Sequence, residues 1–355
     1  MSDFRTAVFA APGAPGAIHM FDRPRLGRRS VLVTIGACGV ADDDRRVLRG
    51  EGPANLSWPL TPGQEAAGVI TELGTDLTVD SLGAPLKPGA KVLVPSFAPC
   101  TRCSVCLHHP GLAARCRHPS HLYGGWADAA HTDFAAHPGA RLYRVPDDMP
   151  LWLAILTAPF ATAMRGLRRA GEAGGFTPGA TVVIHGTGPI ALLSVAAARE
   201  MGAGRVIVAT GSEDTFARLC RQFGAEATIG SDTPAERIEI VRETEAGLGA
   251  DLVLNHGAVA ADSLAMLRDG GVCVDFGPGG TLPADLAARD LTLIGSSAHA
   301  PTDLVAGLRL LYRARGSYPF LKMIVRHPLT PTGIAAALAE VDLKPVLVPN
   351  PDIIG

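Results

Sequence analysis

Four cysteines lie close together in one short segment of the sequence, and their spacing is that of a metal site. Cys100, Cys103, Cys106 and Cys116 follow the pattern C-x2-C-x2-C-x9-C. Four thiolates at this spacing can surround one tetrahedral zinc ion at about 2.3 Å each, and such a closed shell leaves no position for a substrate. Free or disulfide-bonded thiols are the alternative, but a reducing compartment disfavours disulfides, and three Cys at successive x2 spacings are rare by chance. We expect a structural zinc, and we expect three rival histidines to lie on the loop surface: His108, His109 and His118.

A glycine-rich turn near the middle of the chain has the sequence of a nucleotide-binding loop. The β-branched run TVVIHG (181–186) leads through this turn into a helical pattern that ends near Gly202. The turn reads G-x-G-x-x-A, in which small residues permit close approach of the backbone to a pyrophosphate at the helix N-terminus. A glycine turn in an unrelated α/β domain is the alternative. The residues expected to contact the cofactor here are Gly186, Thr187, Gly188, Pro189, Ile190 and Ala191.

Predicted strands alternate with predicted helices on the C-terminal side of this turn. The strands are expected at 181–186, 205–210, 227–230, 251–256, 271–277 and 291–297. Such alternation is typical of a doubly wound parallel sheet, which binds its ligand at the carboxyl ends of the strands. Two residues that end strands complete the expected cofactor site: His256 and Gly277.

The end of the second strand of this series indicates which nucleotide binds. An acid normally receives the ribose 2′-hydroxyl of NAD at that point. Here Thr210 or Gly211 holds the place, so the usual carboxylate is missing. The side chains that can meet a 2′-phosphate instead are Thr210, Ser212 and Arg218 or Arg221. Glu213 and Asp214 oppose this interpretation, although acids also suit the first turn of a helix. We expect NADP(H) rather than NAD(H).

The composition indicates a compact protein without a charged partner. A chain of 355 residues is long enough for two domains, and 47% hydrophobic residues with 41 Gly and 28 Pro are typical of a loop-rich α/β protein. The 32 basic and 34 acidic residues nearly balance, so neither nucleic acid nor an anionic membrane is indicated. The sequence shows no signal-peptide pattern and no apolar run of about 20 residues. We expect a cytoplasmic protein that acts on a small-molecule substrate.

Several motifs together resemble the zinc-containing medium-chain dehydrogenase/reductase family, which includes the alcohol and polyol dehydrogenases. They are GTGPIA after a strand, the four clustered Cys, YGGWADAAH before RLYRVPDDM, and HPLTP before KPVLVP. The likeness runs from about residue 5 to 350. It implies an α/β fold with a GroES-like β-rich substrate domain at 1–150 and 297–355, a zinc lobe at about 96–120, and a Rossmann domain at 151–296. A homodimer or homotetramer is expected. The family usually has x7 before the last Cys, so x9 lengthens that loop.

The segment ACGVADDDRRVLRG departs from the family pattern where a catalytic zinc would bind. The family typically has a segment like ACGICGSDLHxxxG, whose second Cys binds that zinc. Without a gap, this alignment keeps Cys38 as the first Cys, which is not a ligand. It places Ala41 at the ligand, Asp43 at the hydroxyl that relays the substrate proton, and Arg46 at the His that passes it onward.

The other two ligand positions of the family also lack their usual residues. In place of the GHE motif the chain has Gly63, Gln64 and Glu65, and in place of an EPL-type segment it has Ala158 before Pro159. A catalytic zinc needs about three protein ligands and one open position, and Gln64 offers only a weak amide oxygen. A shifted alignment that makes Cys38 a ligand still leaves Gln64 in place of His. We expect one zinc per chain and no catalytic zinc.

The missing metal limits the chemistry. Reduction of a conjugated C=C or of an iminium needs no Lewis acid. Alternatively, a protein acid can replace the zinc by donating a proton to the substrate, if burial raises the pKa of Asp43, Asp44 or Glu65 towards neutrality. Asp44 also matches the family Asp that braces the ligand shell, and Glu65 can pair with Lys344. The leading hypothesis is an NADPH-dependent reductase of an activated C=C or C=N bond. The alternatives are an alcohol or polyol dehydrogenase with a carboxylate acid/base, a non-redox nucleotide-binding protein, and a cofactor-assisted lyase or cyclase.

Overall fold

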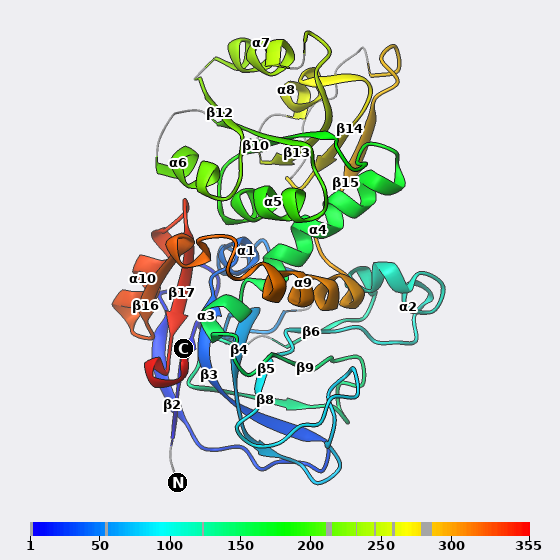
Figure 1. The fold of residues 1–355 in the computed structure, drawn as a ribbon. Helices are drawn as coiled ribbons and strands as arrows, with labels where there is room; N and C mark the ends of the chain where they lie inside the picture. The colour runs from blue at the N-terminus through cyan, green and yellow to red at the C-terminus, as the bar shows by residue number, and fades with distance from the viewer. Residues whose placement is uncertain are drawn as a thin grey trace. The chain divides into compact units, whose positions relative to one another are not determined.

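The computed structural model describes residues 3–53, 56–122, 124–210, 215–231, 233–244, 246–257, 260–277 and 286–355. The chain divides into two compact units (Figure 1). Unit 1 comprises Met1–Thr157, Ala300–Leu308 and Ile324–Gly355, and unit 2 comprises Ala158–His299 and Arg309–Met323. None of the helices in the described residues is long and apolar enough to cross a bilayer.

Unit 1 is built on a seven-stranded sheet in which strands from the two ends of the sequence pair with each other. The order is β16-β17-β3-β4-β5-β9, and β8 pairs with β3. Red C-terminal β17 therefore lies beside blue β3 (Figure 1). The strands of this sheet are β3 (Ser30–Gly39), β4 (Glu65–Leu73), β5 (Lys91–Leu93), β8 (Ala129–Asp133), β9 (Tyr143–Arg144), β16 (Ile324–Pro328) and β17 (Lys344–Val348). Two strand pairs complete the unit: β1 (Phe4–Val8) with β2 (Ala17–Phe21), and β6 (Phe97–Ala98) with β7 (Ser120–His121).

The apolar core of unit 1 lies against this sheet, where Ile35, Ile70 and Trp126 are fully buried. The helical segments of the unit are short. They are α1 (Asp42–Leu48), α2 (Ser104–His108), α3 (Leu151–Ala154), α10 (Pro331–Ala339) and the 3₁₀ turns Pro110–Arg115 and Pro351–Ile353. Helix α9 (Pro301–Ala314) begins in unit 1 and ends in unit 2.

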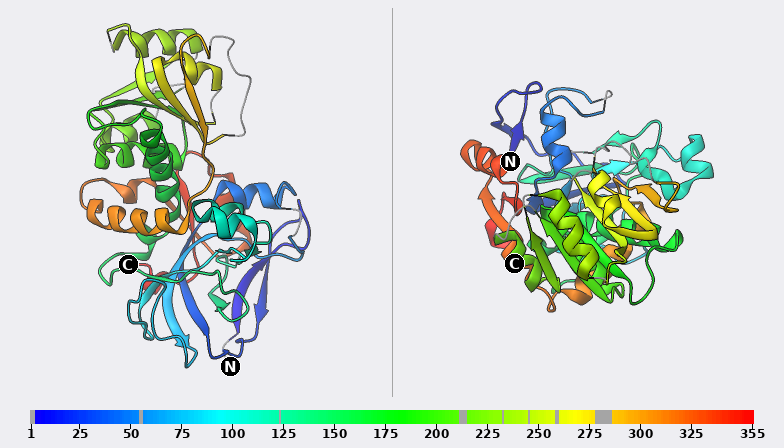
Figure 2. Two further views of the ribbon diagram at one scale, coloured as in Figure 1. Left: turned by 90° about the vertical axis from the view of Figure 1, so that its right-hand side faces the viewer. Right: turned by 90° about the horizontal axis from the view of Figure 1, so that it is seen from above.

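Unit 2 contains the predicted doubly wound sheet. Its six strands run parallel in the order β12-β11-β10-β13-β14-β15, with the helices packed against them (Figure 2). The strands are β10 (Thr181–Gly186), β11 (Arg205–Thr210), β12 (Ala227–Gly230), β13 (Ala250–His256), β14 (Leu267–Asp275) and β15 (Thr292–Gly295). The helices are α4 (Thr157–Glu172), α5 (Pro189–Glu200), α6 (Thr215–Gln222), α7 (Pro234–Thr244), α8 (Ala260–Ala265) and the 3₁₀ turn Phe320–Met323. The α/β fold class, with a GroES-like and a Rossmann part, is confirmed.

The two units differ from the expected domains 1–150 with 297–355 and 151–296 at three places, of which the smallest is residues 297–299, which belong to unit 2. Residues 151–157 belong to unit 1, where α3 packs on β3 and β4. Residues 309–323 belong to unit 2 because their aromatic rings pack there. Tyr318 stacks on Phe223 with 6.1 Å between ring centroids, and Phe320 meets the same ring edge-on at 5.5 Å. The Tyr318 hydroxyl also donates to Glu200.

Candidate functional site

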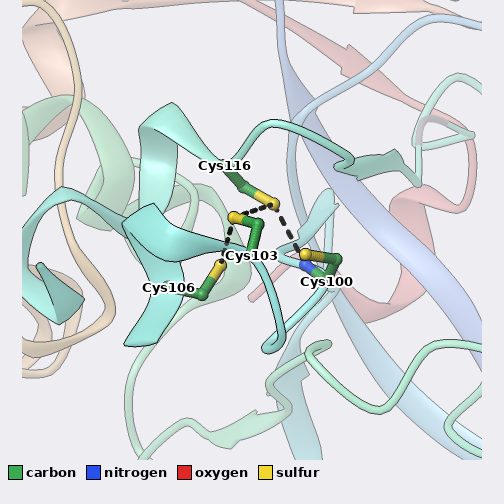
Figure 3. Close-up of side chains that lie close together, drawn as sticks. All are labelled: Cys100, Cys103, Cys106 and Cys116. Atoms are coloured by element: carbon green, nitrogen blue, oxygen red, sulfur yellow. Dashed lines mark hydrogen bonds between the residues drawn. The ribbon is translucent and has the colours of Figure 1, made fainter. Parts of the chain in front are cut away.

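The four clustered cysteines converge in a lobe formed by α2 and the 3₁₀ turn that follows it (Figure 3). Their four sulfur atoms all lie within 4.8 Å of one another, and no disulfide joins them. Backbone N–H groups of Arg117 and Cys106 lower the pKa of Cys103 to about 6, which favours the thiolate. Four convergent sulfurs fit a structural zinc. His108, His109 and His118 are exposed and stand outside this cluster, as expected.

The predicted nucleotide-binding turn lies between β10 and α5, in the order strand, turn and helix. Gly186 and Gly188 have φ of 113° and 100°, values that L side chains rarely adopt. A Cβ on Gly186 would lie 2.6 Å from the carbonyl oxygen of His256, so only glycine fits there. Helix α5 begins at Pro189 directly after this turn, and Ala191 is fully buried beneath it. The first N–H groups of α5 are the donors that a pyrophosphate needs, so the turn fits a dinucleotide.

The residues expected to select the nucleotide are only partly described. Thr210 is buried at the end of β11, whereas Gly211, Ser212, Glu213 and Asp214 lie outside the described residues. Arg218 is exposed on α6 and donates to the Thr215 hydroxyl over 2.8 Å. Arg221 donates to the Thr228 hydroxyl on β12. The preference for NADP(H) therefore stays a prediction.

Two imidazoles, the buried His185 and the half-buried His256, lie at the carboxyl ends of β10 and β13. The His256 Nε2 atom is 3.0 Å from the Ser194 hydroxyl, which itself donates to the Ile190 carbonyl, so Nε2 is the donor. The His256 ring stacks on Phe276 at 4.5 Å. His185, which sequence reasoning missed, has its Nδ1 atom 2.7 Å from Ser263 Oγ.

Burial keeps both of these histidines neutral. It lowers the pKa of His256 to about 3 and that of His185 to about 4. The predicted residue Gly277 lies nearby after β14, where its N–H donates to Asp275 and a Cβ would lie 3.3 Å from the Cα of Gly257. The carboxyl edge of this sheet therefore combines close backbone with two neutral imidazoles.

In unit 1, Asp44 joins the two segments where the family resemblance places metal ligands. One carboxylate oxygen accepts from the Ala41 N–H over 2.9 Å, and the other accepts from the Gly63 N–H over 3.1 Å. Asp44 is 1% exposed, and burial raises its pKa to about 7. The brace expected of Asp44 is therefore present, and it holds Ala41 beside the segment that carries Gln64.

Asp43 does not meet the condition of burial that the acid hypothesis requires. Its carboxylate is exposed on α1 and lies 3.6 Å from the guanidinium of Arg46. The two residues are three positions apart, so this is an ordinary pair on the solvent face of a helix. Its catalytic role stays a prediction, with solvent rather than burial around the carboxylate.

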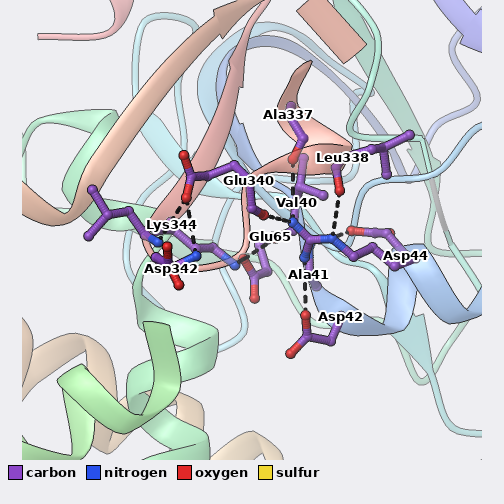
Figure 4. A network of polar contacts seen from close by, with 12 residues as sticks. Val40, Ala41, Asp42, Asp44, Glu65, Ala337, Leu338, Glu340, Asp342 and Lys344 are labelled. Atoms are coloured by element: carbon purple, nitrogen blue, oxygen red, sulfur yellow. Dashed lines mark hydrogen bonds and ion pairs between the residues drawn. The ribbon is translucent and has the colours of Figure 1, made fainter. Parts of the chain in front are cut away.

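Glu65 and Lys344 form the expected ion pair, which joins β4 to β17 (Figure 4). Their side chains are 10% and 4% exposed, and the Lys344 ammonium also donates to the Val40 carbonyl over 3.1 Å. Burial raises the pKa of Glu65, and Lys344 opposes that rise. The pair fixes the strand that ends just before Ala41.

Cys38 is fully buried in β3, where its thiol donates to the Gly39 carbonyl over 3.5 Å. Burial raises the pKa of this thiol well above its usual value. A neutral core thiol is a poor metal ligand, which argues against the shifted alignment.

Two buried donors beside Gly63 have no hydrogen-bond partner among the described residues: Gln64 Nε2 and Trp126 Nε1. Gln64 was predicted as a site residue, but Trp126 was not. The only sequence signal for Trp126 is its place directly after the glycine pair of YGGWADAAH.

Ala158 belongs to unit 2, in the first turn of α4. Its carbonyl accepts from the Thr162 hydroxyl over 3.1 Å, and that hydroxyl is 3.4 Å from His299 Nδ1. Among the described residues, the group of His, Cys, Asp or Glu side chains that converge as metal ligands is the four-Cys cluster, which includes none of these positions.

Comparison with known proteins places this chain among zinc-type dehydrogenases. Residues 27–147 match the alcohol dehydrogenase GroES-like domain, and residues 189–312 match the zinc-binding dehydrogenase domain. The chain is 31% identical to 5-exo-hydroxycamphor dehydrogenase of Pseudomonas putida over 330 residues, or 87% of each protein. It is 28% identical to L-threonine 3-dehydrogenase of Symbiobacterium thermophilum over 365 residues, or 99% of each.

Solved structures share the fold. An alcohol dehydrogenase from Thermotoga maritima superposes with a TM-score of 0.85 at 24% identity, covering 99% of this chain and 100% of that one. A zinc-binding dehydrogenase from Sinorhizobium meliloti, solved with NADP bound, has a TM-score of 0.82 at 24% identity, covering 98% and 100%.

Proposed function

Because the chain belongs to the zinc-type medium-chain alcohol dehydrogenase family and is thus an oxidoreductase that uses a pyridine nucleotide, we propose that it reduces an activated C=C or C=N bond with NADPH and without a catalytic zinc. The bound nucleotide supplies the hydride.

The observation that carries the proposal is the Asp44 brace. It holds the backbone of Ala41 and Gly63 together as the metal site of this family requires, yet the side chains at 41 and 64 are a methyl group and a carboxamide. At the third position where the family resemblance places a zinc ligand, Ala158 has another methyl group. A zinc that polarises a carbonyl needs about three good ligands, which this donor set does not provide. The residues therefore do not fit a catalytic zinc.

The chain's own residues have defined tasks in this proposal. The turn at Gly186 and Gly188 and the N-terminus of α5 bind the pyrophosphate. Neutral His256 adds no positive charge at the carboxyl end of β13. The four cysteines hold a structural zinc that shapes their lobe, away from these positions in the sequence. A homodimer or homotetramer and a cytoplasmic location stay predictions.

A second candidate is alcohol or polyol oxidation with a carboxylate as acid/base. The pKa of about 7 at Asp44 favours it, and so do the relatives, which are dehydrogenases of alcohols by name. Against it, both oxygens of Asp44 already accept from backbone N–H groups. A base that is held this way is poorly placed to accept a substrate proton.

Metal analysis together with a substrate screen tests the proposal. We expect one zinc per chain, and NADPH oxidation with an enone or an imine that is faster than with simple ketones and faster than with NADH. Alcohol oxidation with a basic pH optimum would favour the second candidate. Nucleotide binding without turnover of any substrate would favour a non-redox protein or a cofactor-assisted lyase or cyclase. Two tightly bound zinc ions per chain would overturn the metal-free site.

A further inference from the structure

His256 contacts both ends of the predicted pyrophosphate-binding turn in unit 2. At the start of the turn, its backbone pairs with Gly186, so closely that a Cβ on Gly186 would lie 2.6 Å from the His256 carbonyl oxygen. At the end of the turn, its ring nitrogen Nε2 lies 3.0 Å from the hydroxyl of Ser194 in α5. That hydroxyl donates to the carbonyl of Ile190, in the first turn of the helix, over 2.9 Å. One residue at the end of β13 therefore fixes the chain from Gly186 to Ile190.

The direction of these hydrogen bonds assigns the tautomer of the His256 ring. A serine hydroxyl has one proton, and that of Ser194 is directed to Ile190, so His256 donates through Nε2. The ring is neutral, because burial lowers its pKa to about 3. His256 therefore supplies no positive charge to a pyrophosphate, and what it contributes to binding passes through Ser194.

The His256 ring is also held by aromatic packing. It stacks on Phe276 with 4.5 Å between the ring centroids and 8° between the ring planes. Phe276 packs against α4 at Gly166, where an added Cβ would collide with the phenyl ring. Ser194 itself is 0% exposed. An imidazole that is stacked on one ring and hydrogen-bonded through one nitrogen has little rotamer freedom left to lose, so it can hold α5 in a single position.

We propose that His256 is a positioning residue for the dinucleotide, which acts through Ser194 to hold the first turn of α5 where its N–H groups meet the pyrophosphate. That turn has few donors, because Pro189 has no N–H, so a small shift of α5 misaligns those of Ile190 and Ala191. The role of His256 requires only that a pyridine nucleotide binds. It does not rest on the C=C or C=N substrate of the proposed function, so each of the two can fail without the other.

Three variants of the full-length protein test the connection. His256→Phe keeps a ring that can stack on Phe276 but has no donor, and Ser194→Ala removes the acceptor alone. His256→Gln is the conservative variant, since its amide nitrogen reaches about as far from the backbone as Nε2 does. Ser263→Ala is the matched control: its hydroxyl is also 0% exposed and also bonds a histidine, His185, but it lies in α8.

Fluorescence titration gives the Kd of each variant for NADPH and for NADH, and thermal unfolding checks the fold. We expect His256→Phe and Ser194→Ala each to raise the Kd of the tighter nucleotide about three- to tenfold, as the loss of one hydrogen bond does. The double variant should be no weaker than the weaker of the two single variants, because both remove the same bond. His256→Gln and Ser263→Ala should stay within about twofold of the parent.

A role in packing alone predicts a different pattern. Additive losses in the double variant, or no recovery in His256→Gln, would overturn the proposal. So would Ser194→Ala with parental affinity, or a parent that binds neither nucleotide. If His256→Phe fails to fold, Ser194→Ala and Ser263→Ala decide the question. A parent that binds NADPH but reduces neither enones nor imines would overturn the proposed function and leave the role of His256 standing.

Discussion

The ammonium group of Lys344 lies against the carboxylate of Glu65 inside unit 1, and water reaches neither charge freely. The two residues belong to β17 and β4, which lie on opposite sides of β3. The pair therefore crosses the centre of the sheet, next to the strand that leads to Ala41.

Lys344→Met should be strongly destabilising, since it leaves the Glu65 carboxylate buried without its cation. A loss of about 3–5 kcal/mol in the free energy of unfolding is expected. The double variant Glu65→Gln with Lys344→Met should recover most of that loss, because no buried charge is left. Urea unfolding of the three proteins measures this. If Lys344→Met is as stable as the parent, the ion pair contributes nothing to the free energy of unfolding.

Acid should destabilise the protein through two histidines of unit 2, His185 and His256. The pKa values of His256 and His185 are about 3 and 4 in the folded chain, against an ordinary value of 6.5. The unfolded chain therefore binds more protons between pH 6.5 and 4, so the stability that neutral burial supplies is complete above pH 6.5 and is lost as the pH falls. Each histidine contributes a slope of up to about 1.4 kcal/mol per pH unit in that window.

His185→Asn keeps a polar atom near Ser263 and removes one of the two titrating groups. Its free energy of unfolding should fall less steeply than that of the parent between pH 6.5 and 4. His131→Asn, at an exposed position, is the control and should follow the parent. Urea unfolding at a series of pH values gives the slopes, and equal slopes for His185→Asn and the parent would contradict the assignment.

Asp43→Asn should leave turnover within about threefold of the parent if the substrate is already activated. The carboxylate is exposed and paired with Arg46, so its loss removes a surface ion pair and little else. Steady-state kinetics on the best substrate of the screen measures the effect. A loss of about a hundredfold or more in kcat, with unchanged NADPH binding, would instead identify Asp43 as the proton donor.

Serine at both Cys100 and Cys103 should remove the structural zinc, because two of its four ligands lose their thiolates. Elemental analysis should then find less than about 0.1 zinc per chain against one in the parent. The lobe has little apolar core of its own, so limited proteolysis should cut it near α2 in the variant. Serine at Cys220, a buried cysteine of unit 2, should leave the zinc content unchanged.

Local sequence was enough to predict the strands of unit 2. Each predicted strand from β10 to β15 is present, because a β-branched run followed by a turn and a helix is determined largely by near neighbours. The boundary at 309–323 was not predictable in this way. It depends on Tyr318 and Phe320 meeting Phe223, a contact between segments far apart in the chain.

The aspartate triplet, Asp42 to Asp44, shows a different limit of prediction from sequence. Residues 42, 43 and 44 differ only in their angle around α1, and Asp44 alone shares the buried face with Val47 and Leu48. The helical period of Val47 and Leu48 was available in the sequence and could have assigned Asp44 to the interior and Asp43 to solvent. The unmet donor of Trp126 had no such signal, because it depends on which acceptors the folded chain fails to supply.

The position of β17 has a consequence for how the chain acquires its shape during synthesis. One side of β3 is covered by β17, whose residues 344–348 are made later than every strand of unit 2. The six strands of unit 2 all lie between residues 181 and 295 and can pair before β17 has left the ribosome. The nascent protein can therefore complete the sheet of unit 2 before that of unit 1, and an open strand edge near Cys38 and Gly39 waits for its partner until β17 has been made.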